Sequence, residues 1–102
     1  MNRITIFPGV MLQKSQLDQI RAAGAAFAYC SVPSDPQYPR VAMCCYFLTP
    51  TRREVAHLSP LALADGKAEV NLYSRQWGDH LDNAYSIIPL QPYYDRTEEW
   101  ST

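Results

Sequence analysis

Three cysteines and two histidines are the side chains of this 102-residue chain that could support nucleophilic catalysis. Cys30, Cys44 and Cys45 fall in segments with the pattern of β-strands, in which neighbouring residues point to opposite faces of the sheet. A thiol buried in a sheet has a raised pKa and stays unreactive unless a histidine lies within hydrogen-bond reach. Either His57 or His80 could supply that imidazole. A small enzyme that uses Cys or His is therefore one alternative, although packing explains the cysteines more simply.

Residues 79–82 bring two carboxylates and an imidazole together, and a metal ion can bind these donor types. A turn cap at Asp79 and a solvated carboxylate at Asp82 are the simpler interpretation. No pair of cysteines has the C-x-x-C spacing of a zinc site, and the four glycines are too scattered to form a phosphate-binding loop. We therefore expect neither a metal nor a cofactor.

Arginines flank the most apolar segment of the chain, which contains Tyr46 and Phe47. They are Arg40, Arg52 and Arg53. A sheet that exposes aromatic rings beside arginines can stack nucleic-acid bases, so a weak single-stranded nucleic-acid binder is a second alternative. The net charge of −1 and the isoelectric point near 6.0 would make such binding weak and sensitive to salt.

The near-neutral net charge conceals an uneven distribution of charged residues. Residues 1–53 hold six basic against two acidic side chains, and residues 54–102 hold three basic against eight acidic ones. An acidic half of this kind can form a surface for a basic partner.

Tyrosine and tryptophan favour protein binding, because these side chains and arginine are the usual anchors of protein interfaces. Segment 33–39 carries three prolines and would present Tyr38 with little loss of conformational entropy. The candidate binding residues are aromatic or acidic side chains expected in loops, on exposed strand faces or near the C-terminus. They are Tyr38, Tyr73, Trp77, Asp79, Asp82, Tyr93, Tyr94, Asp95, Glu98, Glu99 and Trp100.

The function that we expect is that of a small, non-enzymatic, protein-binding module of the accessory or inhibitor type. It would dock an acidic, Tyr- and Trp-rich surface on a basic partner, such as a nucleic-acid-binding complex. Small single-domain proteins without motifs are often accessory or inhibitor proteins of bacteria, phages and mobile elements. An edge strand near Pro89 could also pair with a second copy to give a homodimer.

The cytoplasm is the expected location, since the cysteine count is odd and Pro8 interrupts the short apolar stretch at the N-terminus. No segment approaches the roughly 20 apolar residues of a membrane span. Strands are predicted at 3–7, 25–32, 40–49, 68–77 and 85–90, with a turn at 8–9 and a helix between an N-cap at Ser15 and a C-terminal Gly24. Segment 40–49, without charge after its first residue, should be a central strand covered on both faces.

Residues 51–59 fit two structures. Thr51 and Glu54 have the spacing of a helical capping box, and Pro60 would end that helix, so we favour a short helix. The alternative is an edge strand over 54–58. The order β-α-β-β-(α)-β-β predicts an α+β fold: an antiparallel sheet of four to five strands with one or two short helices packed on one face. A single domain would cover 1–92, followed by an aromatic and acidic tail over 93–102.

Overall fold

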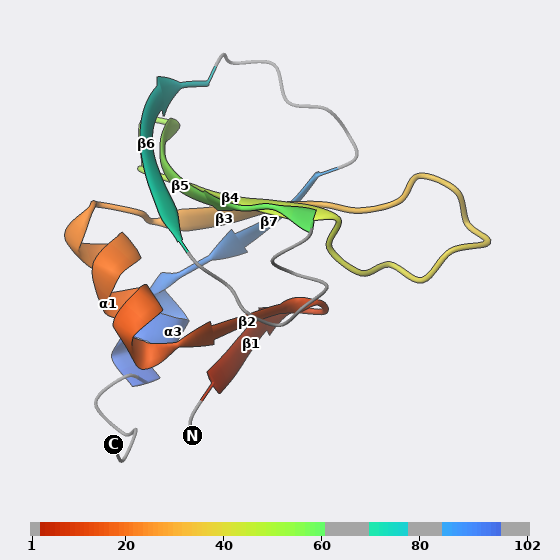
Figure 1. The fold of residues 1–102 in the computed structure, drawn as a ribbon, viewed down its shortest axis with the longest axis horizontal. Helices are drawn as coiled ribbons and strands as arrows, with labels where there is room; N and C mark the ends of the chain where they lie inside the picture. Colours follow the sequence, from red (N-terminus) through yellow and green to blue (C-terminus); the bar gives the residue numbers. More distant parts are fainter. Residues whose placement is uncertain (1–2, 61–69, 78–84, 97–102) are drawn as a thin grey trace.

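A five-stranded antiparallel sheet forms the centre of the computed structural model, which describes residues 3–60, 70–77 and 85–96. Its strand order is β6-β5-β4-β3-β7, and a separate hairpin, β1-β2, packs below it together with the helices (Figure 1). The elements are β1 (Arg3–Phe7), β2 (Val10–Gln13), α1 (Lys14–Ala22), β3 (Phe27–Ser31), β4 (Cys44–Leu48), β5 (Arg53–Leu58), β6 (Asn71–Gln76), β7 (Tyr85–Pro89) and α3 (Gln91–Arg96). The predicted α+β fold, with an antiparallel sheet and short helices, is confirmed.

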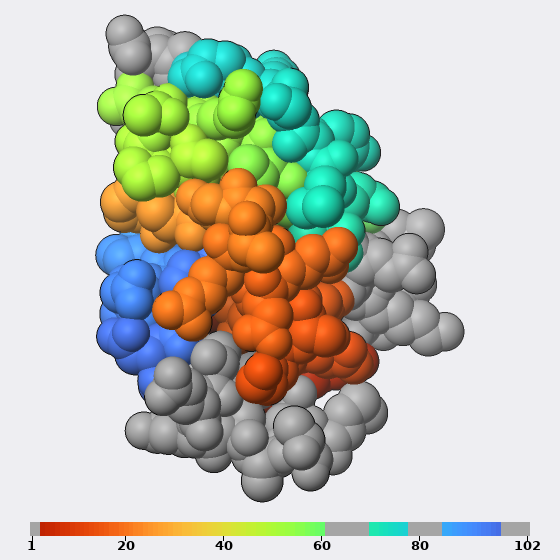
Figure 2. All heavy atoms as spheres, turned by 90° about the vertical axis from the view of Figure 1, so that its left-hand side faces the viewer, coloured from red at the N-terminus to blue at the C-terminus, as the bar shows by residue number. Residues whose placement is uncertain are grey.

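The hydrophobic core lies between the sheet and the layer formed by α1, α3 and the β1-β2 hairpin. Phe47 of β4 is fully buried there and pairs with Ala28 of β3 on one side and Ala56 of β5 on the other. The two small alanine side chains leave room for the large ring, as close packing requires. From α1, Leu17 and Ile20 are buried against this face. Figure 2 shows the α1 segment between α3 with β7 (blue) and β6 (cyan).

The N-terminal strand and the turn at residues 8–9 are confirmed, but the strand β2 that follows was not predicted. The helix α1 begins two residues earlier than expected. Gln13 is its N-cap, and the Gln16 side chain accepts a hydrogen bond of 2.8 Å from the Gln13 backbone N–H, so Ser15 is not the cap. Gly24 follows the helix with φ +96°, as predicted for the residue after a helix end.

The helix favoured over residues 51–59 is wrong, because Arg53–Leu58 form strand β5. A tight turn over residues 49–53 explains the error. The Thr49 backbone carbonyl accepts from the Arg52 N–H at 2.9 Å, and the Thr49 N–H donates to the Arg53 carbonyl at 2.9 Å. Arg52 takes φ 65°, which closes a β-hairpin and does not start a helix. The strand is also not at an edge, because it pairs with β4 and β6.

The C-terminal part of the described chain differs from the predicted tail over its first residues. Residues 93–96 belong to α3, and Tyr94 is only 4% exposed. Its hydroxyl donates a hydrogen bond of 2.6 Å to the Ala25 carbonyl, and its ring lies 5.3 Å from the guanidinium carbon of Arg21. The ring therefore fills the gap between α3 and α1. Residues 97–102 lie outside the described residues.

The strands at the two edges of the sheet are β6 and β7. The edge position predicted from Pro89 is confirmed for β7, and all six residues of β6 are exposed. Strand β4 is central as predicted, although Cys44 and Tyr46 on its outer face are only half-buried. At nine and six residues, neither helix in the described segments is long enough to cross a membrane.

Candidate binding surfaces

The outer face of the sheet, turned away from the core, carries a cluster of aromatic rings. Residues that alternate with the core positions of β3, β4 and β5 must point to this face, and they include Tyr29, Tyr46 and His57. Tyr46 pairs with both of the others across the strands. Among the described residues, the outer-face cluster consists of Tyr29, Tyr46, Glu54, His57, Tyr73, Trp77 and Tyr85.

Trp77 lies at the centre of this cluster. Its ring centroid is 5.0 Å from that of Tyr46, 5.5 Å from Tyr85 and 5.8 Å from Tyr29, each in an edge-to-face arrangement. The His57 and Tyr73 rings stack with centroids 4.4 Å apart and planes at 22°. Because these rings contact one another directly, the outer-face cluster acts first as a second, smaller packing centre over the sheet.

A buried carboxyl group lies among these rings. Glu54 is 3% exposed, and its Oε1 accepts a hydrogen bond of 2.8 Å from the Trp77 indole Nε1. Its Oε2 is 3.6 Å from Nδ1 of His57, which is buried and makes no hydrogen bond with the described residues. A carboxylate beside an imidazole is a pair that can orient or move a proton. The arrangement therefore holds one element of acid–base chemistry.

The cysteines do not complete a catalytic pair in the described part of the chain. The Cys44 thiol is in hydrogen-bond contact with the Tyr46 hydroxyl at 3.5 Å, and not with an imidazole. That contact is the first cause, and burial the second, of a pKa of Tyr46 raised above its ordinary value, so the phenol stays protonated. Cys30 and Cys45 are fully buried on the core face. His80 and the carboxylates beside it lie outside the described residues.

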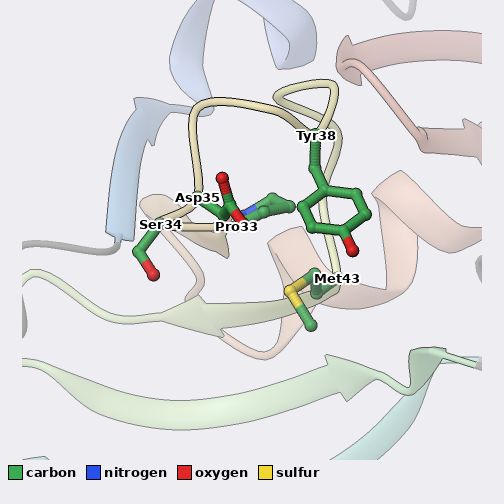
Figure 3. A pocket seen from close by; sticks show the side chains of 5 residues that line it. All are labelled: Pro33, Ser34, Asp35, Tyr38 and Met43. Carbon is green, nitrogen blue, oxygen red and sulfur yellow. The ribbon is translucent and has the colours of Figure 1, made fainter.

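A second surface is the long loop between β3 and β4, which extends away from the sheet (Figure 1). Its side chains include two large exposed groups, Tyr38 at 62% and Met43 at 52% exposure. They line an open hollow of about 410 Å³ together with Pro33, Ser34 and Asp35. Figure 3 shows the Tyr38 ring above the Met43 thioether, with the Pro33 ring beside Tyr38. The lining is mostly apolar.

Hydrogen bonds give this loop a defined shape. Asp35 Oδ1 accepts from the Gln37 backbone N–H at 2.9 Å, and the Asp35 carbonyl accepts from the Tyr38 N–H at 3.2 Å. Both are local turn contacts typical of an aspartate next to proline. At the base, Met43 N–H donates to the Ser31 carbonyl at 2.7 Å. The Tyr38 backbone is thus held in place by the loop itself.

The β1-β2 turn supports the same loop. The Ala42 backbone N–H donates to the Pro8 carbonyl at 2.9 Å. Gly9 has φ +90°, and a Cβ at that position would lie 2.6 Å from Cγ1 of Val41. A glycine is therefore needed here for both its conformation and its lack of a side chain.

The structure separates the candidate binding residues. Tyr73 and Trp77 belong to the outer-face cluster, and Tyr38 belongs to the loop. Tyr93, Tyr94 and Asp95 are on α3, below the sheet, where Tyr93 donates to the Ile6 carbonyl at 3.3 Å and Asp95 accepts from Gln91 at 2.8 Å. The remaining candidates, Asp79, Asp82, Glu98, Glu99 and Trp100, lie outside the described residues.

Sequence reasoning missed Tyr29, Glu54, His57 and Met43 as surface or cluster residues. The signal for Tyr29 was available, since it alternates with the buried Cys30 and lies in a strand with small neighbours. The spacing of Thr51 and Glu54 predicts a helical capping box, so the position of Glu54 in a strand was not expected. For the nucleic-acid alternative, Phe47 is in the core and cannot stack on a base.

Comparison with known proteins adds no relative. No family model, no curated protein and no solved structure matches this chain. The function must therefore be argued from the geometry of the two surfaces alone. In the outer-face cluster the aromatic rings pack against one another. In the loop, by contrast, the large side chains of Tyr38 and Met43 are exposed to solvent.

Proposed function

We propose that the chain is a protein-binding module that acts without chemistry of its own and uses the loop between β3 and β4 as its contact. The observation that carries this proposal is the exposure of Tyr38 and Met43 over one hollow in a hydrogen-bonded, proline-containing loop. Large apolar groups held in water in a fixed arrangement are costly unless they are covered by a partner.

The lining of the hollow favours a protein as the partner. Tyrosine is a frequent interface anchor because it offers a large rigid surface with few rotatable bonds. Methionine adapts to the shape of whatever packs against it. A hollow of about 410 Å³ with one carboxylate, Asp35, at its rim suits an apolar side chain of a partner next to a basic one. The proposed partner is therefore still basic, as expected from the sequence. Its contact is the loop between β3 and β4, and not the acidic second half of the chain.

Rigidity of the loop adds to the argument. Three prolines and the turn at Asp35 restrict the free loop, so binding costs little conformational entropy. Support from Pro8 and Gly9 fixes the loop relative to the sheet. An accessory or inhibitor protein that docks a preformed loop in a pocket or groove would use these features.

The test is capture of proteins from the cells that make the chain, with immobilised wild-type chain and matched variants. Tyr38→Ala and Met43→Ala each remove one exposed wall of the hollow. Ile87→Ala is the control, because Ile87 is 50% exposed on the edge strand β7, away from the loop. We expect a saturable partner whose affinity falls at least about tenfold in the loop variants, as for interface anchors, and is retained in Ile87→Ala.

Capture that Tyr38→Ala and Met43→Ala leave unchanged would contradict the proposal, provided that both variants unfold at the wild-type denaturant concentration. Loss of capture in Ile87→Ala alone would show that the partner contacts the β7 edge, and this result would also contradict the proposal. Circular dichroism of the four proteins supplies the folding control.

A further inference from the structure

Two of the three free cysteines lie opposite each other in the core. Cys30 of β3 and Cys45 of β4 are direct cross-strand partners, and their Sγ atoms are 3.5 Å apart. Both side chains are fully buried on the core face of the sheet. Cys44, one residue away, is on the outer face and contacts Tyr46, so it points away from this pair.

We propose that Cys30 and Cys45 form a cross-strand disulfide when the chain folds in the presence of a dithiol-oxidising agent such as glutathione disulfide. Directly paired residues of antiparallel strands have Cα atoms roughly 4.5 to 5.5 Å apart, and disulfides accept about 4.4 to 6.8 Å. The two backbones therefore already have the separation that the bond requires. To form the bond, the two sulfurs must approach from 3.5 Å to about 2.0 Å.

The chemistry balances with one molecule of glutathione disulfide. The first thiol loses its proton, and its sulfur attacks one glutathione sulfur, which breaks the glutathione S–S bond and releases one glutathione thiolate. The second cysteine then attacks the mixed disulfide, forms the Cys30–Cys45 bond and releases the second glutathione. The two cysteine protons end on the two glutathione thiols. The protein is oxidised by two electrons and the glutathione disulfide is reduced by the same number.

Folding decides when this reaction occurs. Burial raises the pKa of the Cys45 thiol well above its ordinary value, and the neighbouring Cys30 thiol raises it further, so little Cys45 thiolate forms in the folded chain. Cys30 is fully buried as well, which keeps an oxidant in solution away from both sulfurs. The mixed disulfide must therefore form while the strands are open, and closure of β3 on β4 selects the partner. Once formed, the bond is shielded from reductants by the same burial.

The bond would close the base of the loop between β3 and β4. It is one residue pair in from the end of the hairpin, where Ser31 pairs with Cys44, and it would enclose the 14 residues 31–44. A crosslink at that position restricts the open chain and stabilises the hairpin that presents Tyr38. This inference stands on the cysteine pair alone and does not depend on a partner for the loop.

The experiment refolds the reduced, denatured wild-type chain in a glutathione buffer with excess glutathione disulfide, then blocks free thiols in acid and digests with trypsin. Cleavage after Arg21, Arg40 and Arg52 puts Cys30 in peptide 22–40 and both other cysteines in peptide 41–52. We expect these two peptides to be linked in most molecules. Because peptide 41–52 holds two cysteines, Cys44→Ser and Cys45→Ser variants are refolded in parallel.

The expected pattern is specific for one pair. The link persists in Cys44→Ser, and it falls at least about tenfold in Cys45→Ser at the same glutathione ratio, since the folded sheet holds Cys44 on the other face. Three free thiols in the refolded wild type would overturn the proposal. So would linkage of Cys30 to Cys44 in Cys45→Ser to the same extent. If Cys45→Ser fails to fold, fragmentation of the linked wild-type peptides identifies the cysteine that is bonded.

Discussion

Trp77 Nε1 donates a hydrogen bond of 2.8 Å to Oε1 of Glu54, a carboxyl group that the sheet and the surrounding rings bury almost completely. This bond ties the residue after β6 to strand β5 and joins the outer-face cluster to the sheet beneath it. It also satisfies a buried polar group that would be costly to leave without a partner. The pair explains why an indole and an acidic side chain occupy a face that is otherwise aromatic.

Replacing Trp77 by Phe should test this pair. The variant keeps an aromatic ring but removes the donor, so Glu54 loses its partner inside the cluster. We expect the free energy of unfolding to fall by about 1–3 kcal/mol, the cost of an unsatisfied buried acceptor. Urea unfolding followed by circular dichroism measures it.

Tyr73→Phe is the control for this variant. The Tyr73 ring stacks on His57 and is half exposed, so we expect the free energy of unfolding to change by less than about 0.5 kcal/mol. Equal losses in both variants would refute a special role for the indole.

Gly9 and Gly24 offer a matched pair of substitutions. Both have positive φ, so alanine strains the backbone at either position by about 1–2 kcal/mol. Only at Gly9 would the added Cβ also collide, 2.6 Å from Val41 Cγ1, whereas at Gly24 the nearest atom is 3.7 Å away. Gly9→Ala should therefore destabilise the chain more than Gly24→Ala, as measured by thermal unfolding.

Removing the collision should abolish the difference in stability between Gly9→Ala and Gly24→Ala. In a Gly9→Ala chain, the further change Val41→Ala deletes the Cγ1 atom that the new Cβ meets. We expect its stability to approach that of Gly24→Ala, because only the backbone strain remains. A double variant that is less stable than Gly9→Ala would show that the contact of the turn with the loop base is favourable packing and not a steric limit.

Tyr94 predicts a loss of stability in alkali. Burial raises the pKa of its phenol above the ordinary value of 10.0, so the folded chain keeps the proton at pH values where the unfolded chain releases it. The stabilisation is complete below about pH 10 and declines as the pH rises further, because ionisation then favours the unfolded state. Tyr94→Phe, which also loses the hydrogen bond to Ala25, should be about 1 kcal/mol less stable near pH 7.

The difference between wild type and Tyr94→Phe should shrink above about pH 10, since only the wild type has this phenol to ionise. Denaturant unfolding at a series of pH values measures it. A difference that stays constant up to about pH 11 would show that Tyr94 does not keep its proton in the fold.

Local sequence patterns predicted much of the fold for reasons that the structure makes plain. The Pro8-Gly9 turn and the end of α1 at Gly24 depend on backbone conformations that few residues adopt, so local sequence is sufficient there. The segment at Thr51 could not be settled in the same way. A capping-box spacing and a hairpin turn use the same residue types, and pairing of β5 with β4 and β6 decided between them.

The surfaces were predicted less well than the fold, because exposure depends on contacts that are distant in sequence. Tyr38 was expected in an exposed loop and is found there, since its prolines prevent strand pairing locally. Tyr94 was expected near the surface but fills a gap between helices. The outer-face cluster assembles residues from β3, β4, β5, β6 and β7, and no local pattern of the chain contains that information.

Site-specific photocrosslinking at residue 38 in the native cells tests the proposed role of the loop most directly. A photoreactive phenylalanine analogue replaces Tyr38 in one strain and Ile87 in another, because both side chains are exposed and the second lies on a different surface. The proposal predicts one discrete protein adduct from position 38, absent from position 87 and competed by added wild-type chain. No adduct at position 38, or the same adduct from both positions, would contradict it.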